Sequence, residues 1–220
     1  MFLLAVASLG AAPPQLTPSR GDKERELCMD ASTLPPMAKA IDRFDTRVRA
    51  VPDGRWDDPT PCTEWTVRDL VNHLVSEHLW ATHILANETL EQVGSRYDGD
   101  LVGTEPVAAW EGAARGSRPR WAVADARATV HLSMGDAPLS TYAEQMFVDL
   151  TVHEWDLACG SGQDRSLDPD AVAFCLVWAQ ENVEQFAGLG IVAPPIPCTS
   201  DDPMVRMLAL LGRDAAWSPR

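Results

Sequence analysis

The sequence predicts an all-α fold, most simply a four-helix bundle with additional helices toward the C-terminus. Three observations favour it. Apolar residues recur at helical spacing in several segments, Pro or a capping residue precedes most of these segments, and Pro- and Gly-rich loops separate them. A chain of 220 residues with 45% hydrophobic residues also has enough apolar side chains for one substantial core. We therefore expect residues 29–220 to form a single domain.

The first two helices are the most clearly marked. Apolar residues at helical spacing run from Met37 to Val48 after two prolines, which predicts the first helix. Residues 51–65 are dense in Pro, Asp and Gly, as is typical of a loop. The pattern T-x-x-D at Thr66 then supplies a helix N-cap and predicts a second helix that runs to about Glu91.

The remaining segments continue the helical pattern with one interruption. A helix is predicted from Glu105, and Gly116 and Pro119 are expected to fray or bend its second half. Residues 128–140 alternate like a strand and then carry turn residues, so we expect an irregular loop with one short extended piece. Three more helices are predicted at about 139–159, 168–187 and 202–211.

Residues 1–28 are interpreted as a disordered tail outside the fold. An apolar run of signal-peptide length opens the chain, but no Lys or Arg precedes it, and Pro, Gly, Ser and charged residues dominate 13–26. The run is too short to span a bilayer. Two other interpretations stay open: a signal-like segment, or a start assigned too early, with Met29 as the true first residue.

Charge and cysteine content exclude several functional classes. The net charge of −14 argues against nucleic-acid and anionic-membrane partners, because both need clustered Lys and Arg. The five cysteines are odd in number and scattered, without any C-x-x-C pair. This favours a reduced, cytoplasmic setting and gives no support to a zinc finger or a redox motif.

One apolar segment, residues 147–162, carries polar side chains where a core face is expected. Asp149, His153 and Asp156 are spaced by four and three residues, so in a helix they share one face, with Gln145 one turn and Tyr142 two turns before Asp149. Burying two carboxylates costs several kcal/mol unless a partner compensates their charge. A carboxylate and an imidazole one turn apart can reach the same metal ion, which makes Asp149 and His153 candidate ligands.

A third ligand would have to come from another helix, and the second helix offers His73, His78 and His83. Periodicity does not choose among them: His78 projects nearest the centre of the early apolar stripe, while His73 shares a side with several apolar residues. A buried hydrogen-bonded network without metal explains the pattern equally well at this point.

Three motifs resemble a known family. They are PTPCTEWTVRDLVNHLV at 59–75, VDLTVHEWDLACGSGQD at 148–164 and LLGRDAAW at 210–217. Together they are similar to the actinobacterial DinB-like metal-binding proteins, relatives of the N-terminal domain of mycothiol-dependent maleylpyruvate isomerase. The resemblance implies a helical bundle that holds one divalent metal, usually zinc, through His73, Asp149 and His153.

The chemistry of this ligand set is that of an open site. Two imidazoles and one carboxylate leave coordination positions free, so a bound water or thiol would lose its proton more easily. Fe²⁺ and Ni²⁺ suit the same ligand types, and zinc is favoured by the resemblance alone. We expect Asp156 to accept an imidazole N–H, with a backbone contact as the alternative. Tyr142 and Gln145 are expected to line a cavity beside the metal, and the equally weighted alternative for Tyr142 is core packing with its hydroxyl at the rim.

The characterised isomerase carries an additional C-terminal domain that contributes to its active site, so we do not expect maleylpyruvate as the substrate. The resemblance implies instead a thiol-dependent enzyme of the transferase or isomerase type, with mycothiol as co-substrate and a small electrophile as substrate. The alternative is a metal-binding module without turnover that serves as a sensor, carrier or interaction protein. An open cavity of a few hundred Å³ over the metal would favour the enzyme.

Overall fold

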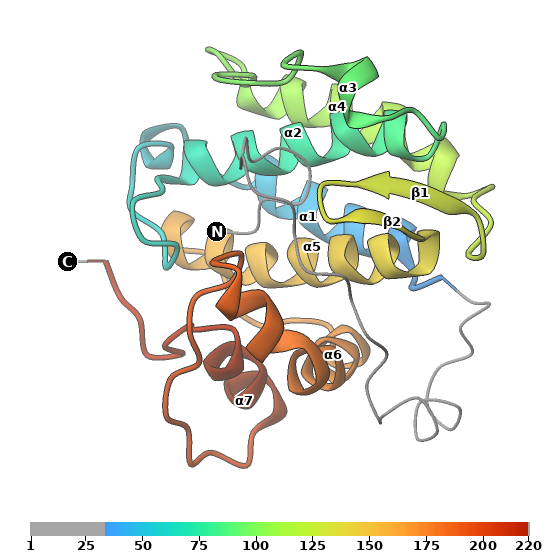
Figure 1. Cartoon of the computed structure of the whole chain (residues 1–220). Helices are drawn as coiled ribbons and strands as arrows, with labels where there is room; N and C mark the ends of the chain where they lie inside the picture. The colour runs from blue at the N-terminus through green and yellow to red at the C-terminus, as the bar shows by residue number, and fades with distance from the viewer. Residues whose placement is uncertain (1–33, 220) are drawn as a thin grey trace.

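The prediction of an all-α fold is confirmed in the computed structural model, which describes residues 34–219. Residues 1–28, interpreted above as a tail, lie outside the described part. Long helices make up most of the molecule, and one short two-stranded sheet accompanies them (Figure 1). The elements are α1 (Met37–Arg49), η2 (Asp53–Arg55), α2 (Val67–Ile84), α3 (Leu90–Val93), α4 (Pro106–Trp121), β1 (Thr129–Leu132), β2 (Gly135–Pro138), α5 (Leu139–Ser161), α6 (Pro169–Gly188) and α7 (Pro203–Leu210).

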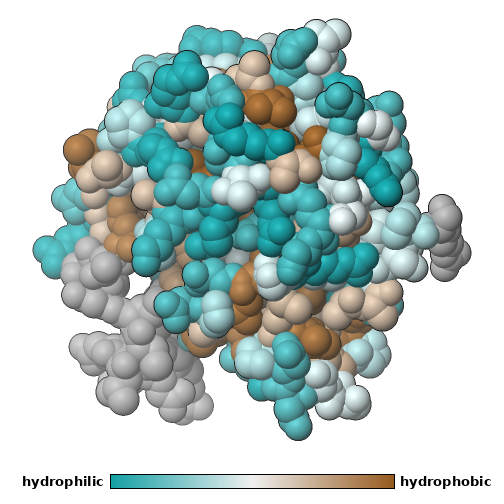
Figure 2. All heavy atoms as spheres, turned by 180° about the vertical axis from the view of Figure 1, so that it is seen from behind, coloured by the Kyte–Doolittle hydropathy of each residue, from teal (hydrophilic) through white to brown (hydrophobic). Residues whose placement is uncertain are grey.

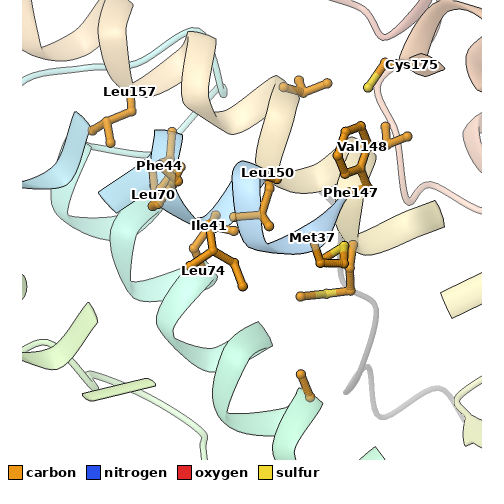
Figure 3. Packing of buried hydrophobic residues seen from close by; sticks show 14 of the residues in the cluster. Met37, Ile41, Phe44, Leu70, Leu74, Phe147, Val148, Leu150, Leu157 and Cys175 are labelled. Carbon is orange, nitrogen blue, oxygen red and sulfur yellow. The ribbon is translucent and has the colours of Figure 1, made fainter. Parts of the chain in front are cut away.

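Four of the helices form the bundle. α1 packs against α4 and α5, and α2 packs against the same two helices. α6 covers another side of α5, and α7 packs against α6. α5 is therefore the central element (Figure 1). Figure 3 shows the core between the helices, where Ile41 and Phe44 of α1, Leu70 and Leu74 of α2, and Leu150 of α5 meet.

The central position of α5 explains its unusual sequence. Residues 145–161 are all buried, which requires an apolar surface nearly all round the helix. The polar side chains within this stretch are therefore enclosed with it. α5 ends at Ser161, close to the predicted end at residue 159.

α2 begins where the sequence predicted and ends earlier than expected. The Thr66 hydroxyl accepts from the backbone N–H of Asp69, and the Asp69 carboxylate accepts from the N–H of Thr66, so both residues cap the helix start. The predicted end at about Glu91 is wrong, because α2 stops at Ile84. Asn87 takes the left-handed conformation with φ of 59°, and Thr89 caps the separate short helix α3.

α4 is more regular than its sequence predicted. The helix continues through Pro119 to Trp121 without the expected fraying. Trp110, Ser117 and Trp121 are buried on the face that packs against neighbouring helices. This tertiary packing outweighs the backbone hydrogen bond that Pro119 cannot donate.

Residues 129–138 form a β-hairpin, where an irregular loop with one short extended piece was expected. β1 and β2 pair antiparallel, with Leu132 opposite Gly135, and Ser133 and Met134 make the turn. Gly135 has φ of 106°, which an L side chain rarely adopts. The second strand, Gly-Asp-Ala-Pro, consists of residues with low strand propensity, so the sequence does not predict it.

The surface is largely polar. Figure 2 shows hydrophilic residues covering most of the face seen from behind, with hydrophobic residues in smaller patches between them. Within residues 34–219, no helix combines the length and the apolar character needed to cross a bilayer.

Candidate metal centre

The side chains of His73, Asp149 and His153 meet in the interior between α2 and α5. Nε2 of His73 lies 3.2 Å from Oδ2 of Asp149, and Nε2 of His153 lies 3.3 Å from Oδ1 of the same carboxylate. Asp149 and His153 sit one turn apart on α5, and α2 supplies His73 from the facing helix. Asp149 and His153 are fully buried, and His73 keeps only 8% of its surface exposed.

The three side chains are close enough together to hold a single ion. One ligand atom from each of them can be chosen so that all three lie within 4.8 Å of one another. Oδ1 of Asp149 is 3.5 Å from Nε2 of His73 and 3.3 Å from Nε2 of His153. Two ligands held about 2.0–2.1 Å from one zinc ion in a tetrahedral arrangement are themselves about 3.3 Å apart. The observed separations therefore match those of ligands that share a metal.

The second nitrogen of His153 has its own acidic partner. Nδ1 of His153 lies 3.0 Å from Oδ2 of Asp156, which is also fully buried and one turn further along α5. A carboxylate on Nδ1 fixes the ring and keeps Nε2 directed at Asp149. Nη2 of Arg213 donates to the same Asp156 oxygen over 3.0 Å, so a buried guanidinium balances the charge of this carboxylate.

Burial and neighbouring charges set the protonation of the cluster. Burial lowers the pKa of His73, and the nearby Asp149 offsets this only in part. Burial also acts to lower the pKa of His153, but Asp149 and the other groups beside it raise that pKa well above its ordinary value. For Asp149, burial acts to raise the pKa and the two imidazoles outweigh it, so the carboxyl stays ionised. The site thus presents one carboxylate between two imidazoles.

A second group of ligand-type atoms lies on the other side of the His153 ring. Sγ of Cys62 is 3.7 Å from Nδ1 of His153 and donates to Asp156 Oδ2 over 3.1 Å. Nη2 of Arg213 also donates to this sulfur over 3.1 Å. A metal ion placed among these atoms would face the positive guanidinium at close range. We therefore assign the candidate metal centre to His73, Asp149 and His153 and not to the Cys62 group.

An open cavity of about 470 Å³ lies beside this cluster, and His73 forms part of its wall. Trp65 lines the same cavity, with its ring centroid 4.9 Å from that of His73 and 5.8 Å from that of His153. Asp149 and His153 do not line it. A molecule bound in this cavity would therefore reach the cluster on the side of His73 and Trp65.

Residues 37–158 match the mycothiol maleylpyruvate isomerase N-terminal domain family. The chain belongs to this family. Two curated relatives are the uncharacterized proteins MT0763 and Rv0738, from Mycobacterium tuberculosis strains CDC 1551 / Oshkosh and H37Rv. Each is 32% identical over 186 residues, which cover 80% of this chain and 94% of the relative. No solved structure matches the chain.

In this member of the isomerase N-terminal domain family, the other histidines of α2 have partners away from the cluster. Nδ1 of His78 lies 2.7 Å from the Ser117 hydroxyl of α4, and the His78 ring packs edge-on against Trp110. His83 lies between Glu88 and Tyr97. The contacts therefore distinguish the three histidines that periodicity could not: of His73, His78 and His83, only His73 faces Asp149.

The structure places Tyr142 and Gln145 away from the cavity that His73 lines. Tyr142 is fully buried and stacks on Trp121, with ring centroids 5.4 Å apart. Gln145 lines a separate cavity of about 140 Å³ beside the hairpin and α6. Neither residue therefore lines the cavity beside His73, although this was expected of both; Tyr142 packs in the core instead. Their spacing from Asp149 puts them on its side of α5, but one and two turns displace them along the helix axis.

Sequence reasoning missed Arg213. The motif LLGRDAAW contributes to the family resemblance, but nothing in its sequence indicates a role for its arginine. Arg213 follows α7 and lies far from Asp156 in the sequence, so no local spacing connects them. Its burial to 4% exposure, between a carboxylate and a thiol, appears only in three dimensions. The sequence likewise indicates no role for Cys62, whose contacts with Asp156 and Arg213 come from distant segments.

Proposed function

We propose that this protein binds one divalent metal ion through His73, Asp149 and His153 and uses it to activate a thiol, as an enzyme of the transferase or isomerase type. The observation that carries the proposal is the convergence of these buried side chains beside an open cavity. Zinc is the first candidate because of the family resemblance, and Fe²⁺ or Ni²⁺ suits the same ligands.

The ligand set favours activation over a purely structural role. Two imidazoles and one carboxylate leave coordination positions for an outside ligand, whereas structural zinc sites are closed by four protein ligands. A divalent ion held by a single carboxylate keeps a net positive charge, which stabilises a bound thiolate or hydroxide. Cys62 does not complete this set, since its sulfur lies against Nδ1 of His153 and not against Nε2.

The chain's own residues would hold and orient the reactants. Asp156 and Arg213 keep the His153 ring in place from behind, and Trp65 covers both imidazoles toward the cavity. The cavity of about 470 Å³ has room for a small molecule next to His73. The family name points to mycothiol as the thiol, and a small electrophile would be its reaction partner.

The proposal is tested by measuring thiol consumption, thiol-dependent conversion of the electrophile and metal content on the same purified samples, because an isomerase would release the thiol again. Wild type is compared with His153→Ala and with His131→Ala, whose imidazole lies on the hairpin and pairs with Asp136. We expect wild type and His131→Ala to carry about one metal per chain and to consume mycothiol with at least one of a panel of electrophiles. His153→Ala should lose most of both, because two remaining ligands rarely hold an ion.

Two results would contradict the proposal in different ways. Equal metal content in wild type and His153→Ala would overturn the ligand assignment. Metal bound in wild type with neither thiol consumption nor thiol-dependent conversion of any electrophile in the panel would instead favour a metal-binding module that serves as a sensor or carrier.

A further inference from the structure

The smaller cavity, away from the metal centre, lies between the hairpin, the first turns of α5 and α6. Its volume is about 140 Å³. The hairpin is tied to the start of α5, because the backbone N–H groups of Leu139 and Ser140 donate to the carbonyls of Ala128 and Ala126 over 2.8 and 3.0 Å. Both strands and α6 also pack against α5 (Figure 1). The walls of this cavity are therefore held together by connected elements.

Gln145 supplies a buried amide to the lining of this cavity. It is only 2% exposed, and its Oε1 atom has no hydrogen-bond partner among residues 34–219. A buried carbonyl oxygen without a donor is unfavourable, so its presence beside a cavity needs a reason. The terminal torsion of Gln has a broad energy profile, which lets the amide turn its oxygen toward a bound molecule. Gln145 therefore indicates a ligand that donates a hydrogen bond.

The other polar lining also favours a neutral donor. Nδ2 of Asn182 donates to the Trp178 carbonyl over 2.8 Å, which leaves Oδ1 as the atom with which Asn182 can accept a hydrogen bond. None of the lining residues is Lys or Arg. A carboxylate would lose its hydration here without gaining a positive partner, whereas a neutral N–H group would meet acceptors.

Apolar side chains form the rest of the wall. Trp178 and Phe186 of α6 are 5% and 4% exposed, and their ring centroids lie 5.1 Å apart. Leu132 lines the cavity from the hairpin. Two aromatic rings beside a small cavity offer packing for a flat apolar group, with the Gln145 amide as the polar group that orients it.

We propose that this cavity binds a small aromatic molecule with a neutral N–H donor, such as a primary carboxamide, which donates to Gln145 and packs against Trp178 and Phe186. This site goes beyond the proposed function and does not rest on it, because none of the proposed metal ligands lines the cavity. Gln145 precedes Asp149 by one turn of α5, so the two sites share a helix.

The test is an NMR titration of the purified protein with a matched pair of probes. Benzamide carries an amide N–H₂ group, and acetophenone has the same shape with a methyl group in its place. We expect benzamide to bind at least about fivefold more tightly than acetophenone, because one well-placed hydrogen bond contributes about this factor. Benzoate should bind more weakly than benzamide.

Two results of this titration would overturn the proposal. One is benzamide binding no more tightly than acetophenone or benzoate. The other is the absence of saturable benzamide binding at millimolar concentrations, which would leave water to satisfy Gln145.

A variant locates the binding site. Gln145→Met keeps a side chain of similar length and removes a buried polar atom that has no partner among the described residues, so we expect it to fold. It should bind benzamide at least about fivefold more weakly than wild type and no longer distinguish benzamide from acetophenone. Gln180→Met, on the exposed surface of α6, is the matched control and should bind benzamide like wild type.

The NMR signals that shift give a second location that needs no variant. We expect benzamide to shift the side-chain amide signal of Gln145 and the indole signal of Trp178 in wild type. Unchanged benzamide affinity in folded Gln145→Met would overturn the assignment to this cavity. Shifts confined to His73 and its neighbours would do the same, because they would place benzamide at the metal centre.

Discussion

Arg213 balances the buried negative charge of Asp156 behind the candidate metal centre. Its guanidinium donates to Asp156 and to the Cys62 sulfur and is almost completely buried. Burial acts to raise the pKa of Asp156, but Arg213 and His153 outweigh it and lower that pKa to about 2. A buried pair of this kind is costly to break, because the partner left behind keeps its charge without compensation.

Replacing Arg213 should therefore destabilise the protein strongly. We expect Arg213→Met to lower the free energy of unfolding by about 3–5 kcal/mol in urea titrations. Adding Asp156→Asn should recover part of the loss, because the unpaired charge is removed. Arg206→Ala, at an exposed position of α7, should change stability by less than about 0.5 kcal/mol. A loss below about 1 kcal/mol for Arg213→Met would contradict this role.

His78 shows the other fate of a histidine inside the bundle. Burial lowers its pKa to about 3, with Arg118 and His73 acting in the same direction and Asp149 acting against them. The neutral ring bonds to Ser117 and packs on Trp110. Between about pH 6.5 and pH 3, His78 is therefore protonated in the unfolded chain and neutral in the folded protein.

This difference in pKa predicts that His78 makes the folded protein less stable in acid. Because the folded-state pKa is below the unfolded value, the stabilisation is complete above about pH 6.5 and is lost as the pH falls toward 3. Between pH 8 and pH 5, wild type should lose about 2 kcal/mol more unfolding free energy than His78→Gln. Urea titrations of both proteins at the two pH values measure this, and parallel losses would contradict it.

At the scale of elements, the end of α5 approaches the loop before α2 very closely. A Cβ atom on Gly160 would lie 2.9 Å from Cγ2 of Thr60, 2.9 Å from Cγ2 of Val67 and 3.0 Å from the carbonyl oxygen of Pro59. Only glycine allows this distance. The approach brings the loop that carries Cys62 onto the helix that carries Asp156.

Two glycine variants separate this packing from helix propensity. Gly112 lies in α4, where an added Cβ meets nothing within 4 Å. Gly112→Ala should stabilise the protein by about 0.5–1 kcal/mol, because alanine favours the helix. Gly160→Ala should destabilise it by about 1–3 kcal/mol through overpacking. Thermal or urea unfolding measures both effects. A stabilising Gly160→Ala would contradict the prediction, because it would show that the loop can move away from the added Cβ.

Most elements could be predicted because their signals are local. Helix starts at Thr66, Pro169 and Pro203 depend on capping residues and prolines that act within one turn. The features that sequence reasoning missed depend on contacts between elements. α4 runs through Pro119 because its buried face is held by other helices, and the hairpin forms although its second strand has little strand propensity.

At the scale of the whole molecule, the candidate site combines segments from distant parts of the chain. Asp149, His153 and Asp156 could be grouped from spacing, since one helix carries them. Spacing alone could not choose His73 over His78, because that choice depends on which face of α2 meets α5 and which meets α4. Arg213 could not be placed, since its partners are 57 and 151 residues away in sequence.

The central claim is that one ion lies among His73, Asp149 and His153, and anomalous diffraction at the absorption edge of the bound metal tests it most directly. We expect a single strong peak within about 2.5 Å of Nε2 of both histidines and of an oxygen of Asp149. A peak between Cys62, Asp156 and Nδ1 of His153, or the absence of any peak beside Asp149 in metal-supplemented crystals, would contradict the account.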